Sequence, residues 1–129
     1  MTTPEERAAL LALKDAVVVG DDAAFRRAAR AVFSTPCQDV ALQLREGRAL
    51  GAYRGSMDAA LALLAAVLPR VHWAIFSQTT PEFVASIIVS RPDGPDEYDG
   101  VAPTPARALL LATIKARLAQ GQAGAAHRA

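Results

Sequence analysis

Cysteine and histidine are the residue types best suited to chemistry here, and the chain has few of them: one cysteine and two histidines. Cys37 falls near the start of a predicted helix, where the helix dipole lowers the pKa of a thiol. No sequence signature of a cysteine enzyme surrounds it, which favours a structural, buried cysteine over a nucleophile. A single cysteine also excludes an intrachain disulfide.

His72 and Trp73 are neighbours on a predicted strand. Adjacent strand residues point to opposite faces of a sheet, so the two side chains cannot easily share one site. We predict Trp73 in the core and His72 at the margin of the sheet. The other histidine, His127, lies in the tail, so we expect neither a metal site nor a catalytic histidine.

An acidic stretch, RPDGPDEYDG, offers oxygen ligands but lacks the spacing of an EF-hand calcium loop. We therefore predict a solvated acidic loop, and the same loop could contact a partner. Its carboxylates are Asp93, Asp96, Glu97 and Asp99.

Arginines gather in the N-terminal half, on two predicted helices joined by a short STP link that resembles the connection of a helix-turn-helix. A basic face on these helices could contact phosphates. Interleaved acidic residues instead favour a solvated, charge-balanced surface. The arginines are Arg26, Arg27, Arg30, Arg45, Arg48 and Arg54.

Catalytic motifs are missing from the sequence. There is no Gly-rich phosphate loop, no pair of carboxylates at catalytic spacing and no serine–histidine–aspartate arrangement. We therefore predict a protein that is not an enzyme and that holds no cofactor or metal.

Composition indicates one small, mainly helical domain. The 129 residues are 52% hydrophobic but only 5% aromatic, and the apolar mass is mostly Ala, Leu and Val. The net charge of +1 is weak for a dedicated nucleic-acid binder. The stretch MTTPEERAAL lacks the basic and apolar regions typical of a signal peptide, and the apolar run 59–68 is far shorter than the ~20 residues of a membrane span. We expect a cytoplasmic protein that does not enter a membrane.

Capping signals predict three helices in the first 50 residues. The first follows Thr3-Pro4 and stops at Gly20; the second is capped by Asp21 or Asp22. The third begins near Thr35 and stops at Gly47. The apolar stripe of the second helix is Phe25, Ala28, Ala29 and Val32.

The second half changes periodicity from helix to strand. A helix capped by Ser56 ends at Pro69. Strands are predicted at 71–77 and 82–90, and a short third strand lies around Tyr98 and Val101. The second strand places Phe83, Ala85, Ile87 and Val89 on one face and Val84, Ser86, Ile88 and Ser90 on the other.

The last predicted helix, Pro105 to about Ala119, is apolar on two sides. One stripe carries large residues, which suit a sheet, and the other carries smaller residues, which suit a neighbouring helix. Because the hairpin is also apolar on both faces, we predict an α+β fold in which a small two- or three-stranded antiparallel sheet lies between helical layers. The stripes are Leu110, Leu111, Ile114 and Leu118, and Leu109, Ala112 and Ala116.

YRGSMDAALALL, a Trp-containing strand and TPARALLLATIKA together resemble the phage ABA sandwich domain family, over about residues 53–119. The resemblance implies an α-β-α layered fold and a phage or prophage origin, and it implies no activity. Arg107 departs from the family pattern, since an apolar residue is typical there. It could anchor a carboxylate or phosphate of a partner beside the helix N-terminus.

These observations predict a single domain over 1–120, made of N-terminal helices (1–50) and the ABA-sandwich-like unit (53–119), with a disordered tail at 121–129. The predicted function is a phage-derived, non-catalytic module that binds a protein or associates with itself. A small sheet has exposed edges, and a homodimer could pair them. The alternative is a nucleic-acid-binding regulator that uses the N-terminal arginines. The candidate contact residues are Arg26, Arg27, Arg30 and Arg107.

Overall fold

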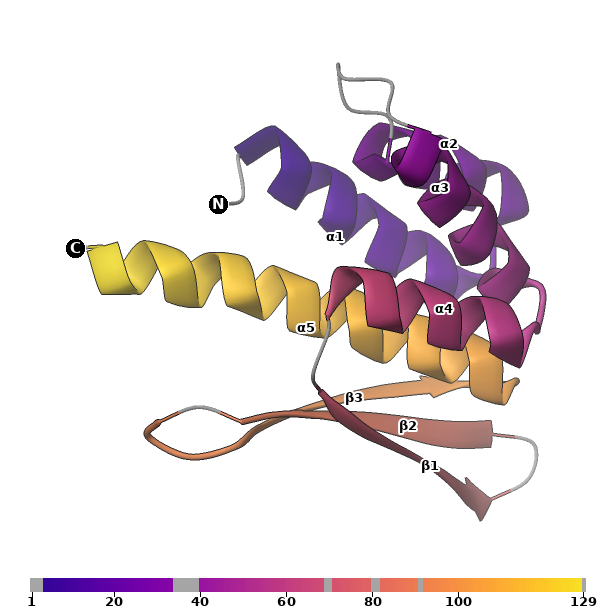
Figure 1. Ribbon diagram of the computed structural model, residues 1–129. Coiled ribbons are helices and arrows are strands. Elements are labelled where there is room, and N and C mark those ends of the chain that lie inside the picture. The colour runs from indigo at the N-terminus through magenta and orange to yellow at the C-terminus, as the bar shows by residue number, and fades with distance from the viewer. Residues whose placement is uncertain (1–3, 34–39, 69–70, 80–81, 91, 129) are drawn as a thin grey trace.

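The computed structural model describes residues 4–33, 40–68, 71–79, 82–90 and 92–128 (Figure 1). It confirms the predicted α+β class. The chain forms helices α1, α2, α3 and α4, then strands β1, β2 and β3, and ends in helix α5. Their bounds are α1 Pro4–Val19, α2 Asp22–Phe33, α3 Val40–Tyr53, α4 Met57–Val67, β1 His72–Thr79, β2 Glu82–Val89, β3 Asp96–Ala102 and α5 Pro105–Arg128.

The three strands form one antiparallel sheet in the order β1-β2-β3. Across the sheet, Trp73 pairs with Ile87, which pairs with Tyr98, and in the next row Ala74 pairs with Ser86, which pairs with Asp99. The register shifts between Ser77 and Thr79 of β1. The third strand, expected around Tyr98 and Val101, is confirmed.

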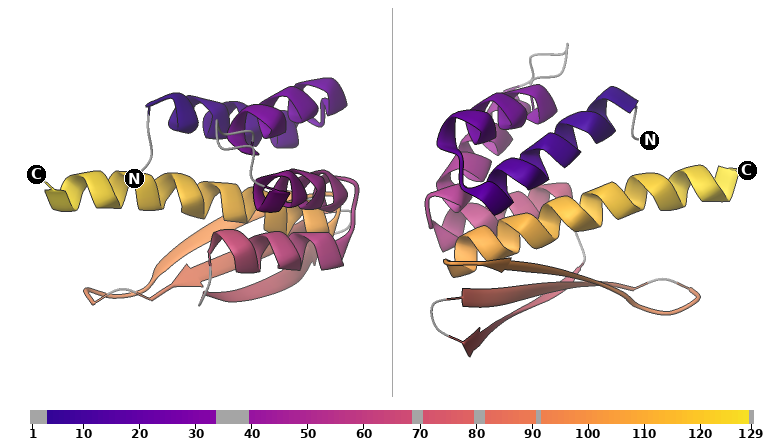
Figure 2. Two further views of the ribbon diagram at one scale, coloured as in Figure 1. Left: turned by 45° about the horizontal axis from the view of Figure 1, so that its top comes forward. Right: turned by 180° about the vertical axis from the view of Figure 1, so that it is seen from behind.

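The helices of the described chain lie on one side of the sheet (Figures 1 and 2). Helix α5 packs on β2 and β3, α4 lies beside α5, and α1 and α3 pack on α5 from above. Helix α2 packs on α1 and α3. The predicted sheet between two helical layers is therefore wrong in this respect: the order is sheet, then α5 with α4, then the remaining helices.

The two apolar faces of α5 explain this order. One face covers the sheet, the other is covered by α1 and α3, and α4 lies beside the helix, so α5 belongs to the middle layer. Its residues Ala108, Leu109, Leu110 and Ala112 are almost fully buried. The second apolar face of α5 is therefore buried by other helices, and it does not require a helical layer on the far face of the sheet.

Gly100 of β3 sets the distance between α5 and the sheet. A Cβ atom at Gly100 would overlap the carbonyl oxygen of Ala108 and lie 2.7 Å from the backbone nitrogen of Ala112. The small residues Ala108 and Ala112 therefore face the sheet, whereas the sequence analysis placed Ala112 against a helix. The absence of a side chain at Gly100 lets the two backbones approach closely.

The local signals for helix ends are mostly confirmed. Gly20 follows α1 with φ of 83°, Asp21 Oδ1 accepts a hydrogen bond from the amide of Ala24 at 3.2 Å, and Ser56 Oγ accepts one from Ala59 at 3.2 Å. The stop at Gly47 is wrong, because α3 continues to Tyr53 and its buried Ala49, Ala52 and Tyr53 pack in the core.

The C-terminal end of the chain differs from its prediction. Helix α5 continues to Arg128, whereas the sequence predicted a disordered tail at 121–129. The alanines of this stretch favour a helix despite its glycines.

The predicted start of the third helix near Thr35 and the stop at Pro69 lie outside the described residues. Within the described part of the chain, every helix is too short or too polar to span a bilayer.

Candidate functional site

The described helices leave one face of the sheet without cover, the face turned away from them (Figures 1 and 2). We call it the uncovered face. It holds Val84 and Ile88 of β2, both half-buried, and Val101 of β3, which is 47% exposed. By the register, Val84 lies beside Val101 and Ile88 lies beside His72 and Glu97.

The opposite face of the same strands belongs to the core. Ala85 and Ile87 are fully buried, and Phe83 and Val89 are half-buried and pack against the core cluster. The predicted split of β2 into two faces is therefore confirmed. Because strand residues alternate, the same contacts assign Val84, Ser86 and Ile88 to the uncovered face.

Polar groups cross the middle of the uncovered face. The hydroxyl of Ser86 donates a hydrogen bond to Asp99 Oδ1 at 2.7 Å. Ser86 is only 4% exposed, whereas Asp99 is open to water. His72 lies on the same face, one row away from Ser86. This pattern is not that of a serine hydrolase, because the serine proton is directed to a hydrated carboxylate rather than to a histidine.

Trp73 is not in the core as predicted. Its side chain is 45% exposed, although its strand partner Ile87 is fully buried on the same face. The reason is its position: β1 is an edge strand, and α5, the helix that covers the sheet, lies over β2 and β3. His72 is exposed at the margin of the sheet, as predicted.

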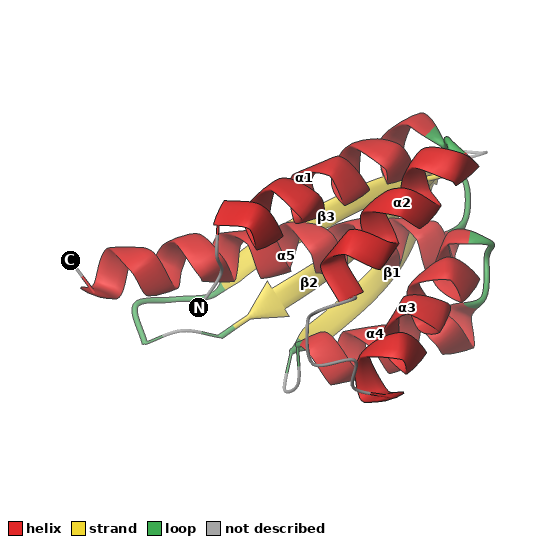
Figure 3. Cartoon of the chain, turned by 90° about the horizontal axis from the view of Figure 1, so that it is seen from above, coloured by secondary structure: helices red, strands yellow, loops and turns green. Residues whose placement is uncertain are grey.

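The two edges of the sheet differ in charge and in cover. Strand β3 carries three acidic residues, Asp96, Glu97 and Asp99, and Lys115 of α5 donates to the backbone carbonyl of Asp99 at 2.8 Å. Strand β1 contains no Asp, Glu, Lys or Arg, and α4 runs along its side of the sheet (Figure 3). Acidic side chains on an edge strand, and a lysine that reaches its backbone from a neighbouring helix, keep that edge from pairing with another strand.

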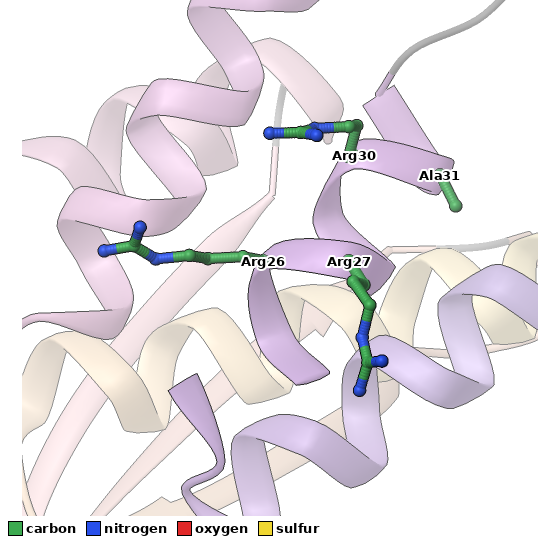
Figure 4. A pocket seen from close by; sticks show the side chains of 4 residues that line it. All are labelled: Arg26, Arg27, Arg30 and Ala31. Carbon is green, nitrogen blue, oxygen red and sulfur yellow. The ribbon is translucent and has the colours of Figure 1, made fainter. Parts of the chain in front are cut away.

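The arginines of α2 form the second candidate surface. Arg26, Arg27 and Arg30 are exposed and, with Ala31, line an open depression of about 400 Å³. Figure 4 shows that Arg26 and Arg30 extend to one side of the helix and Arg27 to another, so the three guanidinium groups do not converge on one point. Arg26 Nε also lies 3.2 Å from Asp22 Oδ2, an exposed ion pair one turn away.

The remaining arginines of the predicted set are only partly described. Arg48 is half-buried and Arg54 is exposed. The side chain of Arg45 and the link between α2 and α3 lie outside the described residues, so the helix-turn-helix connection stays a prediction. Helix α2 contains one acidic residue, Asp22, which pairs with Arg26.

Arg107 is held within the chain. Its Nε and Nη2 donate to the backbone carbonyl of Tyr53, at 3.2 and 3.1 Å, and its guanidinium lies 4.2 Å from the centre of the Tyr53 ring. The other side of the Tyr53 ring stacks on Phe25, with centroids 4.3 Å apart. Arg107 thereby connects the start of α5 with the end of α3, and its donors Nε and Nη2 are engaged inside the protein.

The other chemical candidates do not form a site in the described chain. Asp93 is exposed in the turn before β3, and Asp96, Glu97 and Asp99 belong to β3. Among the described residues, no three His, Cys, Asp or Glu side chains gather closely enough to hold a metal ion. Cys37 lies outside the described residues.

The uncovered face itself was missed by sequence reasoning. Val84 and Ile88 signalled it, because they make the second face of β2 apolar, but the same pattern led to the prediction of a second helical layer. The number of helices was the better signal. Helices α1 to α4 pack on α5 and on one another, so no described helix is left to cover the second face of the sheet.

Comparison with models of protein families, with curated proteins and with solved structures finds no match for this chain.

Proposed function

We propose that this chain is a small, phage- or prophage-derived protein of the cytoplasm that acts by binding rather than by catalysis, and that its contact surface is the uncovered face of the sheet. The observation that carries the proposal is the position of the helices, which pack on one side of the sheet and leave Val84, Ile88 and Val101 on the other. Apolar side chains rimmed by polar ones are typical of an interaction site.

Self-association is the simplest form of this binding. A sheet face that meets a second copy of itself buries the apolar residues of both chains, as in a β-sandwich. The outer strands support the same role, because His72, Glu97 and Asp99 flank the residues of β2 with groups that stay hydrated or pair across an interface.

The test is the mass of the protein in solution across a range of concentrations, by light scattering or sedimentation. We expect a monomer–dimer equilibrium that Val101→Lys shifts to monomer. Val18→Lys is the matched control, because Val18 is an exposed valine on α1, away from the sheet. A wild-type monomer at every concentration would reject self-association through this face.

A protein partner other than itself is tested by recovering the tagged chain from a bacterial host lysate, with and without nuclease. The interaction should survive nuclease and should weaken in the Val101→Lys variant. Recovery that depends on nucleic acid would shift the assignment to the arginines of α2.

Nucleic-acid binding through α2 is the second candidate, supported by the exposure of Arg26, Arg27 and Arg30 on one helix. It predicts salt-sensitive retention of a duplex that is lost when all three are replaced by Ala. The ion pair supplies an opposite test: Asp22→Asn frees Arg26 and should strengthen binding. No retention at low salt by wild type would exclude this reading.

A further inference from the structure

The charges of the uncovered face are not evenly spread. On this face, strand β3 carries Glu97 and Asp99, whereas strand β1 carries His72 and Ala74. Strand β2 between them is apolar at Val84 and Ile88, and its Ser86 is hydrogen-bonded to Asp99. The face therefore has an acidic side and a side that lacks carboxylates.

This asymmetry discriminates between the two ways in which the face can stack on a second copy of itself. A two-fold axis that runs across the strands places strand β3 of one copy over strand β3 of the other. The Asp99 side chains, which lie in the central row with Ser86, would then face each other and bring like charges together. A two-fold axis that runs along β2 places β1 of one copy over β3 of the other.

We propose that two copies of this chain associate face to face about a two-fold axis that runs along β2, so that His72 of each copy meets Glu97 of the other. This inference rests on the proposed function, and it adds the geometry and the specificity of the contact. The register supports it, because His72, Ile88 and Glu97 lie in one row of the sheet. The axis along β2 keeps that row aligned in both copies.

The same axis brings the apolar residues together. Ile88 lies over Ile88 of the second copy and Val84 lies over Val84, while Ala74 of β1 lies opposite Asp99. Stacked sheets are about 10 Å apart, a gap that a histidine and a glutamate can bridge. Glu82 is the other carboxylate of this face in the described chain, and its position at the start of β2 leaves it at the rim in water.

The size of the face sets the expected strength. Seven residues and three strands span about 23 Å by about 14 Å, so the area that two copies bury lies below the ~1,200 Å² at which stable interfaces begin. We therefore expect a weak dimer, with a dissociation constant in the micromolar range or above, and single charges should change this constant measurably.

The experiment is a charge swap measured as the dimer dissociation constant. His72→Asp places a carboxylate opposite Glu97 of the second copy, and we expect dissociation to increase by at least about tenfold. Glu97→Lys should also weaken the dimer. In the double variant the carboxylate at position 72 faces the ammonium group at position 97 of the second copy, so the contact is attractive, and the constant should return to within about threefold of wild type.

Both residues are exposed in the monomer, so the swap should leave the fold intact; thermal unfolding of each variant checks this. Asp58→Lys is the matched control for Glu97→Lys, because Asp58 is an exposed acidic residue on α4, on the helical side of the protein. It makes the same kind of charge reversal and should leave the dimer unchanged.

Trp73, the single tryptophan of the chain, provides a second readout that needs no variant. It lies on the helix side of β1, outside a face-to-face contact, so its emission should not change when the protein is diluted through the dimer equilibrium. A concentration-dependent shift would place the β1 edge in the interface and would overturn the proposed geometry.

The outcomes separate the two proposals. If Val101→Lys dissociates the dimer but the double swap does not recover it, the geometry is wrong and association through the uncovered face stands. If wild type never dimerises, the self-association part of the proposed function fails with it. Recovery in the double variant, with Trp73 emission constant, supports both.

Discussion

The guanidinium of Arg107 lies 4.2 Å from the centre of the Tyr53 ring and donates two hydrogen bonds to the carbonyl oxygen of the same residue. Tyr53 is the last residue of α3, so this carbonyl has no partner within its own helix. Arg107 satisfies it from the first turn of α5. With Phe25 on the far side of the ring, the contact joins α2, α3 and α5.

Arg107→Ala should therefore destabilise the protein by about 2–3 kcal/mol, because the Tyr53 carbonyl loses its hydrogen-bond donors and the ring loses its contact with the guanidinium. Arg107→Lys should recover only part of this, since a lysine offers neither the planar fork nor the stacking surface. The measurement is the free energy of unfolding in denaturant.

Arg26→Ala is the control for that experiment. Arg26 is exposed and its ion pair with Asp22 is hydrated, so the change should be within about 0.5 kcal/mol of wild type. Equal stability of Arg107→Ala and Arg26→Ala would show that the Tyr53 contact has no structural role, and would return Arg107 to the candidates for partner binding.

Gly100 should tolerate no side chain. In Gly100→Ala the added methyl group would overlap the Ala108 carbonyl and crowd the Ala112 amide of α5, so the helix must move away from β3. We expect a loss of about 2–4 kcal/mol in the free energy of unfolding.

Gly47→Ala is the matched substitution. Gly47 lies within α3, and a Cβ atom there would have nothing within 4 Å. Because alanine favours the helix more than glycine does, the variant should be more stable than wild type by about 0.5–1 kcal/mol. Opposite signs for the two changes would establish close contact at Gly100; a neutral Gly100→Ala would refute it.

Local signals predicted much of the fold. Gly20, Asp21 and Ser56 ended or began helices where their chemistry requires it, and the alternation in β2 identified its core face. Gly47 misled because a glycine inside a helix costs little when the flanking residues, such as Ala49 and Ala52, are held by tertiary packing.

The arrangement of the layers could not be predicted in the same way. The two apolar faces of α5 show that it needs two covers, and they do not show which element supplies each. That choice depends on Gly100, which lets Ala108 and Ala112 approach β3. Trp73 was likewise misplaced, because a sequence does not reveal which strand lies at an edge beyond the reach of the helices.

The candidate site was even less visible. Val84 and Ile88 led to the prediction of a second helical layer. Only the positions of α1 to α5 show that the described helices lie on the other side of the sheet. Arg107 was singled out because an apolar residue is typical at its position in the family that the sequence resembles. Its contact with the Tyr53 carbonyl lies 54 residues away in the chain, beyond what helical spacing can predict.

The pair formed by Ser86 and Asp99 predicts a measurable coupling. Ser86 is buried and its hydroxyl donates to Asp99 Oδ1, so Asp99→Ala leaves a polar group without this acceptor. A double-mutant cycle with Ser86→Ala should give a coupling free energy of about 1 kcal/mol. Additive effects of the two single changes would show that the hydrogen bond contributes nothing to stability.

The last part of α5 should be dispensable for the fold. Among the described side chains of α5, the buried ones end at Leu118, and the C-terminal end of the helix extends past the start of α1 (Figures 1 and 2). Deletion of residues 121–129 should therefore change the free energy of unfolding by less than about 1 kcal/mol.

A longer deletion, of residues 113–129, removes the buried Ile114, Ala116 and Leu118 as well. Each large buried side chain is worth about 1.5–3 kcal/mol, and a domain of this size has only about 5–15 kcal/mol in total. Because α5 is the middle layer, its loss also uncovers the residues of α1 and β2 that pack on it. We expect the longer deletion to unfold and the shorter one to show a cooperative thermal transition close to that of wild type. A shorter deletion that unfolds would mean that residues 121–129 make a contact essential to the fold.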